Sequence, residues 1–345
     1  MKKLIRIIFF SLSIFTILCF NNIPSFAVEE TGSYTIEGVP NKNQIDADLG
    51  YFYLHEDPGS EDSVKVKLVN TSNKDIKLQV KLTNANTNSN GIIDYTGQIK
   101  DHESLKVPLT SIAKVTQSEV VVPKQSEVES EIKIIMPNNK LSGVIIGGII
   151  VSKVEDQNEQ KKQNVLSNTY GYTLGLVLTN ENSVDMEKNV SVKLDKVGPV
   201  LSNGKKIIQA NILNANPFIF SKANIKGEII DKDSNEVIKK EEINNVNIAP
   251  YSVFPMQFDW GKNDLKPGIY TFKGIVKVED KEWKLIKDFE ISKSNAKKIN
   301  ENSIYKISIP DWLRYSSYIL LILSTCGTVF TFIKTIKKRK MGDLT

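Results

Sequence analysis

Apolar and polar residues alternate along most of the chain. Ser63–Val69 reads SVKVKLV and Ile76–Leu82 reads IKLQVKL, with an apolar side chain at every second position. Because the side chains of a strand point alternately to opposite faces, this pattern predicts half-buried β-strands. Glu127–Ile135 alternates in the same way. Gly143–Val151, GVIIGGIIV, is apolar on both faces and predicts a central strand, with glycines where a neighbouring backbone or bulky side chain comes close.

The alternation continues in the second half of the chain. The strands expected there are Tyr170–Thr179, Val190–Leu194, Ala210–Leu213, Asn224–Ile230, Glu236–Ile238, Ile269–Val278 and Trp283–Ile291. Turn-forming residues separate them, and no long amphipathic helix is expected among them, only one helical turn near Ser111–Val115. Short strands at this spacing indicate an all-β protein with two tandem immunoglobulin-like β-sandwich domains.

Two apolar segments flank the strands. Basic residues precede the run Leu4–Phe20, and a small-x-small sequence ends at Ala27, so residues 1–27 are predicted to be a cleaved signal peptide. Ser316–Ile333 carries no charge and as a helix spans about 27 Å, enough to cross the hydrocarbon core of a bilayer. A buried core helix is the alternative. The residues expected at the membrane interfaces are Trp312, Tyr315, Tyr318, Lys334, Lys337, Lys338, Arg339 and Lys340.

These segments set the expected boundaries. They are a signal peptide (1–27), a first β-sandwich (28–154), a linker or long loop (155–168), a second β-sandwich (169–293), a polar stalk (294–315), a transmembrane helix (316–333) and a basic cytoplasmic tail (334–345). Because basic flanks stay in the cytoplasm, we expect a single-pass protein of the cell membrane with its N-terminal ectodomain outside.

The charge and the cysteines fit this organisation. The formal net charge is +5, but the two ends hold eight basic residues and one acidic residue, so the exported part carries −2. The basic balance therefore reflects targeting and topology and does not indicate a nucleic-acid partner. The two cysteines, Cys19 and Cys326, lie in the apolar segments. The exported part thus has no disulfide and must be stabilised by ordinary hydrophobic cores.

One loop of the first domain is dense in amides and hydroxyls. Asn84–Tyr95 reads NANTNSNGIIDY, and such a loop offers many neutral donors and acceptors to a polyhydroxylated, N-acetylated glycan. Tyr51 and Tyr53 share one face of the preceding strand Gly50–Leu54. The candidate glycan-binding residues are Asn84, Thr87, Asn88, Asn90, Asp94, Tyr95, Tyr51 and Tyr53. The same loop composition also fits a structural Asx-rich turn, and the strand also fits a core with a half-exposed aromatic pair.

Motifs for catalysis and metal binding are sparse. The chain holds two histidines, His55 and His102, and no serine elbow, zinc-protease, phosphate-loop or dinucleotide motif. A hydrolase or transferase that uses a carboxylate pair stays open as an alternative, because two acids can come from anywhere in the chain. We expect no enzyme and no cofactor.

A calcium-loop pattern occurs once. Asp231, Asp233, Asn235 and Glu242 occupy positions 1, 3, 5 and 12 of the pattern, but Glu236 stands where the sharp turn needs glycine. The flanking apolar residues favour a hairpin turn over Asp231–Asn235.

Several pieces of the chain, in this order, resemble the family of WxL-interacting proteins. In the first domain they are Tyr34–Pro40, Asn43–Ile45, Gly50–Leu54, Pro58–Gly59, Val69–Asn70, Thr87–Tyr95 and Gly143–Ile150. In the second they are Tyr170–Tyr172, Ala210–Asn214, Pro217, Ile248–Ser252, Pro267–Tyr270, Trp283–Phe289 and Ala296–Asn300. The resemblance implies a proposed peptidoglycan-binding domain followed by a proposed host-binding domain.

The resemblance also implies a role. It is that of a non-catalytic surface protein of Gram-positive bacteria, with peptidoglycan, a WxL-domain surface protein and a host extracellular-matrix protein as candidate partners. The one W-x-L match, Trp283–Leu285, lies in an expected strand, so the chain is identified as the partner and not as a WxL protein. No sortase signal precedes the apolar segment, so the anchor is expected to stay in the membrane. A passive spacer is the remaining alternative.

Overall fold

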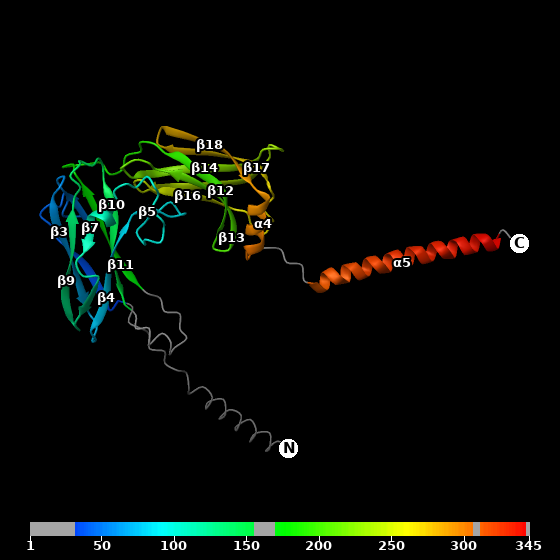
Figure 1. The fold of residues 1–345 in the computed structure, drawn as a ribbon, viewed down its shortest axis with the longest axis horizontal. Coiled ribbons are helices and arrows are strands. Elements are labelled where there is room, and N and C mark those ends of the chain that lie inside the picture. The colour runs from blue at the N-terminus through cyan, green and yellow to red at the C-terminus, as the bar shows by residue number, and fades with distance from the viewer. Residues whose placement is uncertain (1–31, 155–169, 306–310, 343–345) are drawn as a thin grey trace, which may run out of the picture.

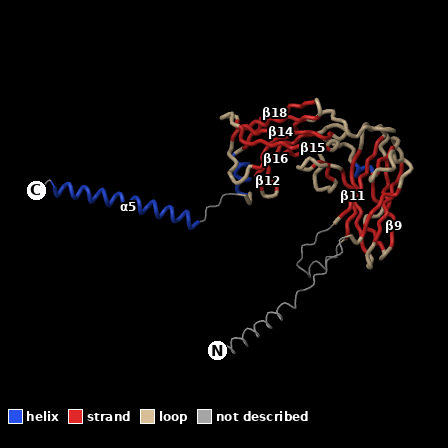
Figure 2. Tube along the Cα trace, turned by 180° about the vertical axis from the view of Figure 1, so that it is seen from behind, coloured by secondary structure: helices blue, strands red, loops and turns tan. Residues whose placement is uncertain are grey.

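The protein consists of two β-sandwich domains, followed by a long C-terminal helix (Figure 1). The structure is a computed structural model, and it describes residues 32–154, 170–305 and 311–342. The two domains meet at an angle, so the strands of the first run across the direction of the strands of the second (Figures 1 and 2). The signal peptide expected at 1–27 and the linker expected at 155–168 lie outside the described residues.

The first domain packs two sheets against each other. The four-stranded sheet has the order β1 (Tyr34–Val39), β3 (Glu61–Asn70), β9 (Ser126–Ile135), β7 (Ala113–Val115). The five-stranded sheet has the order β2 (Phe52–His55), β11 (Gly171–Thr179), β10 (Ile145–Lys153), β4 (Ile76–Asn84), β8 (Glu119–Val122). A short helix, α2 (Leu109–Ile112), and a small hairpin, β5 (Asn86–Thr87) and β6 (Ile93–Asp94), complete it. Val66 and Leu68 of β3 meet Ile149 and Val151 of β10 in one apolar core.

The second domain repeats this architecture. One sheet has the order β12 (Lys193–Ser202), β13 (Lys205–Leu213), β16 (Val253–Asp259). The other has the order β15 (Val237–Ile248), β14 (Phe220–Asp231), β17 (Gly268–Val278), β18 (Lys281–Ile291). Phe254 and Phe258 from the first sheet and Phe220 and Phe272 from the second are fully buried between them. The rings of Phe258 and Phe272 meet edge to face with centroids 6.1 Å apart.

Much of the strand pattern expected from the sequence is confirmed. Ser63–Val69, Ile76–Leu82 and Glu127–Ile135 all lie within strands, and Ile269–Val278 and Trp283–Ile291 form the last hairpin. The all-β class is therefore correct. The helical turn expected near Ser111–Val115 is α2, shifted slightly toward the N-terminus. Strand β16 was not expected from the sequence, because Pro255 interrupts its pattern. Proline is tolerated here since β16 lies at the edge of its sheet.

Strand β11 belongs to the first domain. The expected boundary at residue 169 assigned it to the second sandwich, and the structure differs. β11 pairs antiparallel with β10 from Ile145↔Leu178 to Ser152↔Gly171, and it pairs parallel with β2. Its core-facing residues Leu176 and Leu178 complete the first hydrophobic core. The chain therefore returns to the first sheet after residue 169 and crosses to the second domain only after Thr179.

The expected stalk at 294–315 needs a similar correction, because its first part is the helix α4 (Lys293–Asn302). Ser292 caps the helix, its hydroxyl accepting from the Asn295 N–H at 3.2 Å. Ala296 and Ile299 are buried in the core of the second domain. The segment is mostly polar, but two apolar residues three positions apart on a helix share a face and are enough to hold it against the sandwich.

The C-terminal helix α5 (Asp311–Gly342) contains the expected membrane span. Its 22-residue stretch Trp312–Ile333 has a mean hydropathy of 1.7 and is not buried by other parts of the protein. By length and composition this stretch could cross a membrane. Trp312, Tyr315 and Tyr318 are exposed near its N-terminal end, as expected for an aromatic belt.

Candidate glycan-binding surface and interdomain contact

The Asn-rich loop forms the β5–β6 hairpin and an Asx turn. The Asn88 Oδ1 accepts from the backbone N–H of Asn90 at 2.9 Å and of Ile92 at 3.3 Å. Gly91 has φ +73°, a conformation that favours glycine. Two further amides are also used within the domain, since Asn84 and Asn86 both donate to the Asp101 carboxylate, at 2.6 and 2.8 Å. The amides of Asn84, Asn86 and Asn88 therefore shape the loop, which agrees with the structural alternative.

Part of this loop is covered by the second domain. Thr87 is 0 % exposed, and its hydroxyl oxygen accepts from the Ala249 N–H at 3.0 Å and from the Ser252 hydroxyl at 3.2 Å. The Asn247 N–H donates to the Gly91 carbonyl at 2.8 Å. Thr87 is thus part of the contact between the domains and is not accessible to a glycan in this structure.

An apolar cluster accompanies these hydrogen bonds. Tyr53, Val144, Ile146 and Val177 of the first domain pack with Val184 and Ala249. The Tyr53 hydroxyl donates to the Val184 carbonyl at 3.0 Å, and burial raises the pKa of Tyr53. The first domain and the segment that follows it are therefore joined by a small core of their own, and Tyr53, like Thr87, lies inside it.

Tyr51 and Tyr95 lie beside each other on the outer face of the five-stranded sheet. Beneath them the paired residues Gly148 and Gly175 form a floor without side chains. A Cβ on Gly148 would lie 3.0 Å from the Tyr95 Cβ, and one on Gly175 would lie 3.2 Å from the Tyr51 Cβ. Both tyrosines are half-buried. Burial raises the pKa of each, and the proximity of Tyr51 adds to the shift at Tyr95. The glycine pair thus lets two aromatic side chains lie close against the sheet.

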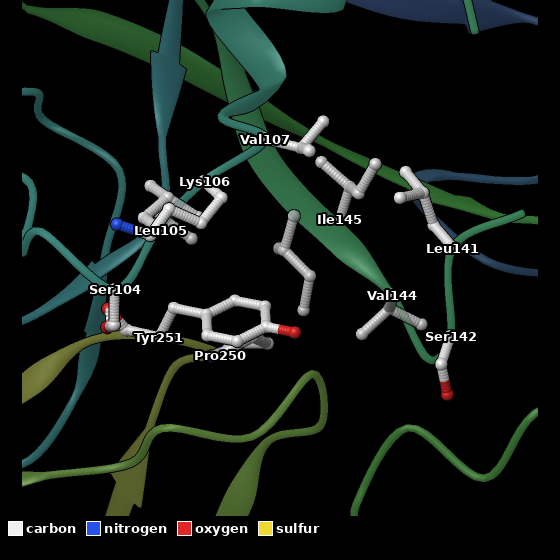
Figure 3. Close-up of a pocket in the computed structure, with 12 residues that line it drawn as sticks. Ser104, Leu105, Lys106, Val107, Leu141, Ser142, Val144, Ile145, Pro250 and Tyr251 are labelled. Carbon is white, nitrogen blue, oxygen red and sulfur yellow. Dashed lines mark hydrogen bonds between the residues drawn. The ribbon is translucent and has the colours of Figure 1, made fainter. Parts of the chain in front are cut away.

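A pocket of about 190 Å³ opens between the domains (Figure 3). Its walls are mostly apolar side chains of the first domain, among them Leu105, Leu141 and Val144, and Pro250 and Tyr251 of the second domain close it. Tyr251 has φ +54°, a left-handed conformation that is unusual for an aromatic residue and costs about 1 kcal/mol or more. The hydroxyl of Tyr251 points into the pocket (Figure 3). The pocket is suited to one apolar group with a hydrogen-bond acceptor beside it.

One pair of carboxyl groups lies close together in the first domain. Glu56, 1 % exposed, and Asp62 both accept from the Asn43 side-chain amide, at 3.2 and 2.9 Å. Burial is the main cause that raises the pKa of Glu56, and the neighbouring Asp62 adds to it. Burial also acts to raise the pKa of Asp62, but hydrogen bonds from Ser63, Glu56 and Asn41 outweigh it, so the pKa of Asp62 is lowered. The two carboxyl groups are thus held in one hydrogen-bond network with Asn41, Asn43 and Ser60, which favours a structural role.

The calcium-loop residues do not form a metal site. Asp231 accepts from the backbone of Asp233 and Ser234 in the β14–β15 turn, as expected for a hairpin. Glu242 lies on β15 and pairs with Lys226 at 3.1 Å. Among residues 32–154, 170–305 and 311–342, no three histidine, cysteine or acidic side chains are grouped to hold a metal ion.

The structure divides the eight candidate glycan residues. Tyr51 and Tyr95 adjoin on the outer sheet face, where both are half-buried and pack against the apolar cluster that joins the domains, and Asp94 precedes Tyr95 in the chain. Asn88 and Asn90 lie near the tip of the hairpin, and Asn84, Thr87 and Tyr53 are buried. The sequence did not indicate Gly148 and Gly175 as the floor of a surface, although their positions in a strand already implied a close approach. It gave no signal for the pocket, whose walls come from distant segments.

Two β-sandwiches followed by an apolar helix are typical of modular surface proteins. The comparisons with known families agree with this class. Residues 34–153 match a family model described as "WxL Interacting Protein, peptidoglycan binding domain", and residues 161–301 match "WxL Interacting Protein, host binding domain". The chain belongs to the WxL-interacting protein family. Both models describe binding domains, which indicates a non-catalytic role at the cell surface.

Comparisons with individual proteins add little. No curated protein sequence matches the chain. Similar solved structures include the E. coli chaperone DraB (11 % identity, 75 % of this chain and 98 % of that chain, TM-score 0.29) and the Pseudomonas aeruginosa CupB2 chaperone (16 % identity, 68 % and 96 %, TM-score 0.27). The PapD-like domain 7 of human CEP192 is similar at 10 % identity (44 % and 87 %, TM-score 0.27). Scores this low carry no argument about function.

Proposed function

We propose that this protein is a membrane-anchored scaffold whose first domain contacts peptidoglycan through Tyr51 and Tyr95. The observation that carries the proposal is the pair of half-buried tyrosines above Gly148 and Gly175, on the outer sheet face of the domain that matches the peptidoglycan-binding model. In this proposal the domains are immunoglobulin-like, residues 1–27 are a signal peptide, and α5 anchors the chain with both domains outside.

The chemistry of the surface supports a glycan ligand. A tyrosine offers an apolar ring face and a hydroxyl that donates and accepts, which together fit the C–H and O–H groups of a sugar. Among the described residues, neither hydroxyl has a hydrogen-bond partner, so both are available to a ligand. Asp94, beside Tyr95, adds an acceptor, although it also holds the Thr96 hydroxyl at 2.6 Å.

Sedimentation with purified peptidoglycan tests this surface. Tyr51→Ala and Tyr95→Ala in the full chain should each lower the affinity by about tenfold or more, the effect expected for an aromatic anchor. Tyr170→Ala is the matched control, because Tyr170 is exposed on the same domain but away from the glycine pair. Binding that survives both substitutions, or is lost equally in the control, would exclude Tyr51 and Tyr95 as the contact.

The interdomain pocket favours a second binding function, for a protein. A WxL-domain surface protein or a host extracellular-matrix protein would place one apolar side chain against Tyr251, since a central buried anchor in a pocket is typical of protein interfaces. Tyr251→Asn removes the ring while keeping the left-handed backbone, which asparagine tolerates. The variant should fold as well as the parent and lose co-purification with the partner; retained co-purification would exclude the pocket.

Two alternatives predict different outcomes. A hydrolase or transferase needs accessible carboxylates, and in the described residues the close pair Glu56 and Asp62 is held by Asn41, Asn43 and Ser60. Release of soluble fragments from peptidoglycan by the purified chain, abolished by Glu56→Gln, would support that alternative. A passive spacer predicts that neither domain binds the wall, a WxL-domain protein or a host ligand.

A further inference from the structure

The chain leaves the second domain at a fixed point. After α4, the Ser303 hydroxyl donates to the Gly204 carbonyl at 2.9 Å, and the Ile304 N–H donates to the same carbonyl at 3.1 Å. Gly204 lies in the β12–β13 turn and has φ +73°. The Ile304 side chain lies directly against it, because a Cβ on Gly204 would be 2.6 Å from the Ile304 Cγ1. The exit of the chain is thus held to the β12–β13 turn.

The distance from this point to the membrane helix is short. Residues 306–310 separate Tyr305 from Asp311, where α5 begins, so the two Cα atoms can lie at most about 21 Å apart. Trp312 is the first residue of the apolar stretch. If α5 spans the bilayer, as the proposed function holds, the β12–β13 turn must stay close to the headgroup layer.

The side chains at this end of the domain have the composition of an interfacial surface. Ile304 is 73 % exposed, and Leu201 and Tyr305 are also exposed although large and apolar. The Lys205 Nζ lies 5.4 Å from the centre of the Tyr305 ring. Apolar and aromatic side chains among lysines are typical of surfaces that insert into the headgroup layer.

A groove continues this surface. It has a volume of about 550 Å³ and runs between the end of β12 and α4, with Pro199, Val200 and Leu201 on one side and Asn295, Lys298 and Asn302 on the other. Two nearby lysines are neutralised, since Lys205 pairs with Asp259 at 3.1 Å and Lys297 lies 3.9 Å from Glu301. Within the described residues, no ion pair involves Lys298, so it brings an uncompensated positive charge to the groove.

We propose that Leu201, Lys205, Lys298, Ile304 and Tyr305 form a membrane-docking surface that rests on anionic lipid headgroups. The apolar side chains enter the interfacial layer and Lys298 meets a lipid phosphate. The inference rests on the proposed membrane anchoring by α5 and adds to it. The anchor alone limits only the distance of the second domain from the bilayer, whereas the docking surface also sets its orientation.

Headgroup quenching of a fluorophore in nanodiscs tests the docking. The full chain carries Cys19→Ser, Cys326→Ser and a single labelled Asn302→Cys. It is placed in nanodiscs of neutral phosphatidylcholine with or without phosphatidylglycerol, and a nitroxide on a fraction of the headgroups quenches the label. Anionic lipid should raise the ratio of docked to free domain by about fivefold, the effect of one lysine near such a surface. A label at Asp280, in the β17–β18 turn at the opposite end of the domain, should stay unquenched.

Two variants separate the contribution of the lysine charge from that of the apolar side chains. Lys298→Gln should remove the effect of anionic lipid, and Ile304→Ser should lower quenching in both lipids. Ile286→Ser is the matched control, since Ile286 is 65 % exposed on the outer face of β18. A chain that elutes with the nanodiscs but shows the same quenching in both lipids and in all variants would overturn the docking surface alone. A chain that does not elute with them would overturn the anchoring, and the surface with it.

Discussion

The outer sheet faces of the two domains differ in what stands at their outward positions. In the second domain, Lys226 and Glu242 pair across β14 and β15 at 3.1 Å, and Lys277 and Glu282 pair across β17 and β18 at 3.1 Å. In the first domain, the five-stranded sheet has one such pair at its β8 edge, Lys77 with Glu119, and further in a glycine pair covered by Tyr51 and Tyr95. The alternation of polar and apolar residues predicts that each sheet has an outer face, but not which side chains make that face suitable for a ligand. Crossed lysines and glutamates keep a sheet face solvated, whereas glycines beneath tyrosines make it suitable for a ligand.

The largest loss of stability is expected for a glycine whose added Cβ would collide with a backbone atom. In Gly147→Ala, the new Cβ would lie 2.2 Å from the Thr83 carbonyl oxygen and 2.3 Å from a Leu109 methyl, so β10 or β4 must shift. We expect the free energy of unfolding of the first domain to fall by about 3 kcal/mol or more. Gly227→Ala in the second domain meets Phe258 and the flexible end of Met256, and it should cost about 1–2 kcal/mol.

Amide hydrogen exchange in β10 and in β14 measures the two effects separately. Each substitution should lower protection in its own domain more than in the other. Equal losses of protection in Gly147→Ala and Gly227→Ala would contradict this prediction. They would show that a backbone neighbour and a flexible side-chain neighbour accommodate a new Cβ at the same cost.

The next effect concerns the contact that joins the domains. Thr87→Val keeps the shape of the side chain but leaves the Ala249 N–H and the Ser252 hydroxyl without their acceptor. A buried unsatisfied donor costs about 1–3 kcal/mol, so protection should fall at the interdomain contact while β3 and β17 keep theirs. Ser252→Ala is the matched control and should cost less, because Thr87 still accepts from Ala249. An equal cost for both variants would contradict the role of the Thr87 oxygen.

The domains should also differ in how their stability depends on pH. The raised pKa of Glu56 stabilises the first domain below the unfolded value of about 4.3, and this stabilisation is lost as the pH rises through the raised folded value. Asp62 contributes with the opposite sign, losing stabilisation as the pH falls through its lowered pKa. In the second domain, the Gly261 N–H is the largest cause that lowers the pKa of Asp259, whose stabilisation is lost only on the acid side.

Glu56→Gln tests this difference. It should flatten the alkaline side of the stability profile of the first domain and leave the second domain unchanged, as followed by urea unfolding between pH 4 and pH 8. An unaltered profile in Glu56→Gln would mean that the raised pKa of Glu56 does not contribute to the stability of the first domain.

The smallest effect is expected on the solvated face. Lys226 and Glu242 are both substantially exposed, so a double-mutant cycle with alanine should give a coupling energy of about 0.2–1 kcal/mol that decreases with salt. A larger, salt-independent coupling would mean that this face is covered by a partner, and the contrast with the tyrosine face would disappear.

Local patterns predicted most strands but not their partners. The period-two segments of β3, β4 and β9 are each half-buried, so their own residues reveal them. The expectation that glycines of Gly143–Val151 meet a close neighbour is confirmed at Gly147 and Gly148. The assignment of β11 required knowledge of its pairing with β10 and β2, which no local pattern contains. Helix α4 was missed because only Ala296 and Ile299 are buried in it.

The candidate surface was predicted only in part, for a related reason. Composition identified the Asn-rich loop and Tyr51, and strand alternation separated Tyr53 from Phe52. Whether a polar side chain such as Thr87 faces solvent or a second domain depends on tertiary contacts between segments far apart in the chain. The same holds for Tyr51 and Tyr95, which become neighbours only when β2, β10 and β11 are aligned.

The parallel pairing of β2 with β11 has a mechanical consequence. Under the proposed function, with the wall bound at Tyr51 and the C-terminus anchored in the membrane, tension acts between the start of β2 and Thr179, the end of β11. Because the two strands run in the same direction, these points lie at opposite ends of the pair, and tension slides the strands along each other. The pairs from Phe52↔Leu176 to His55↔Thr179 then bear the load together instead of opening one by one. The connection is built to resist shear.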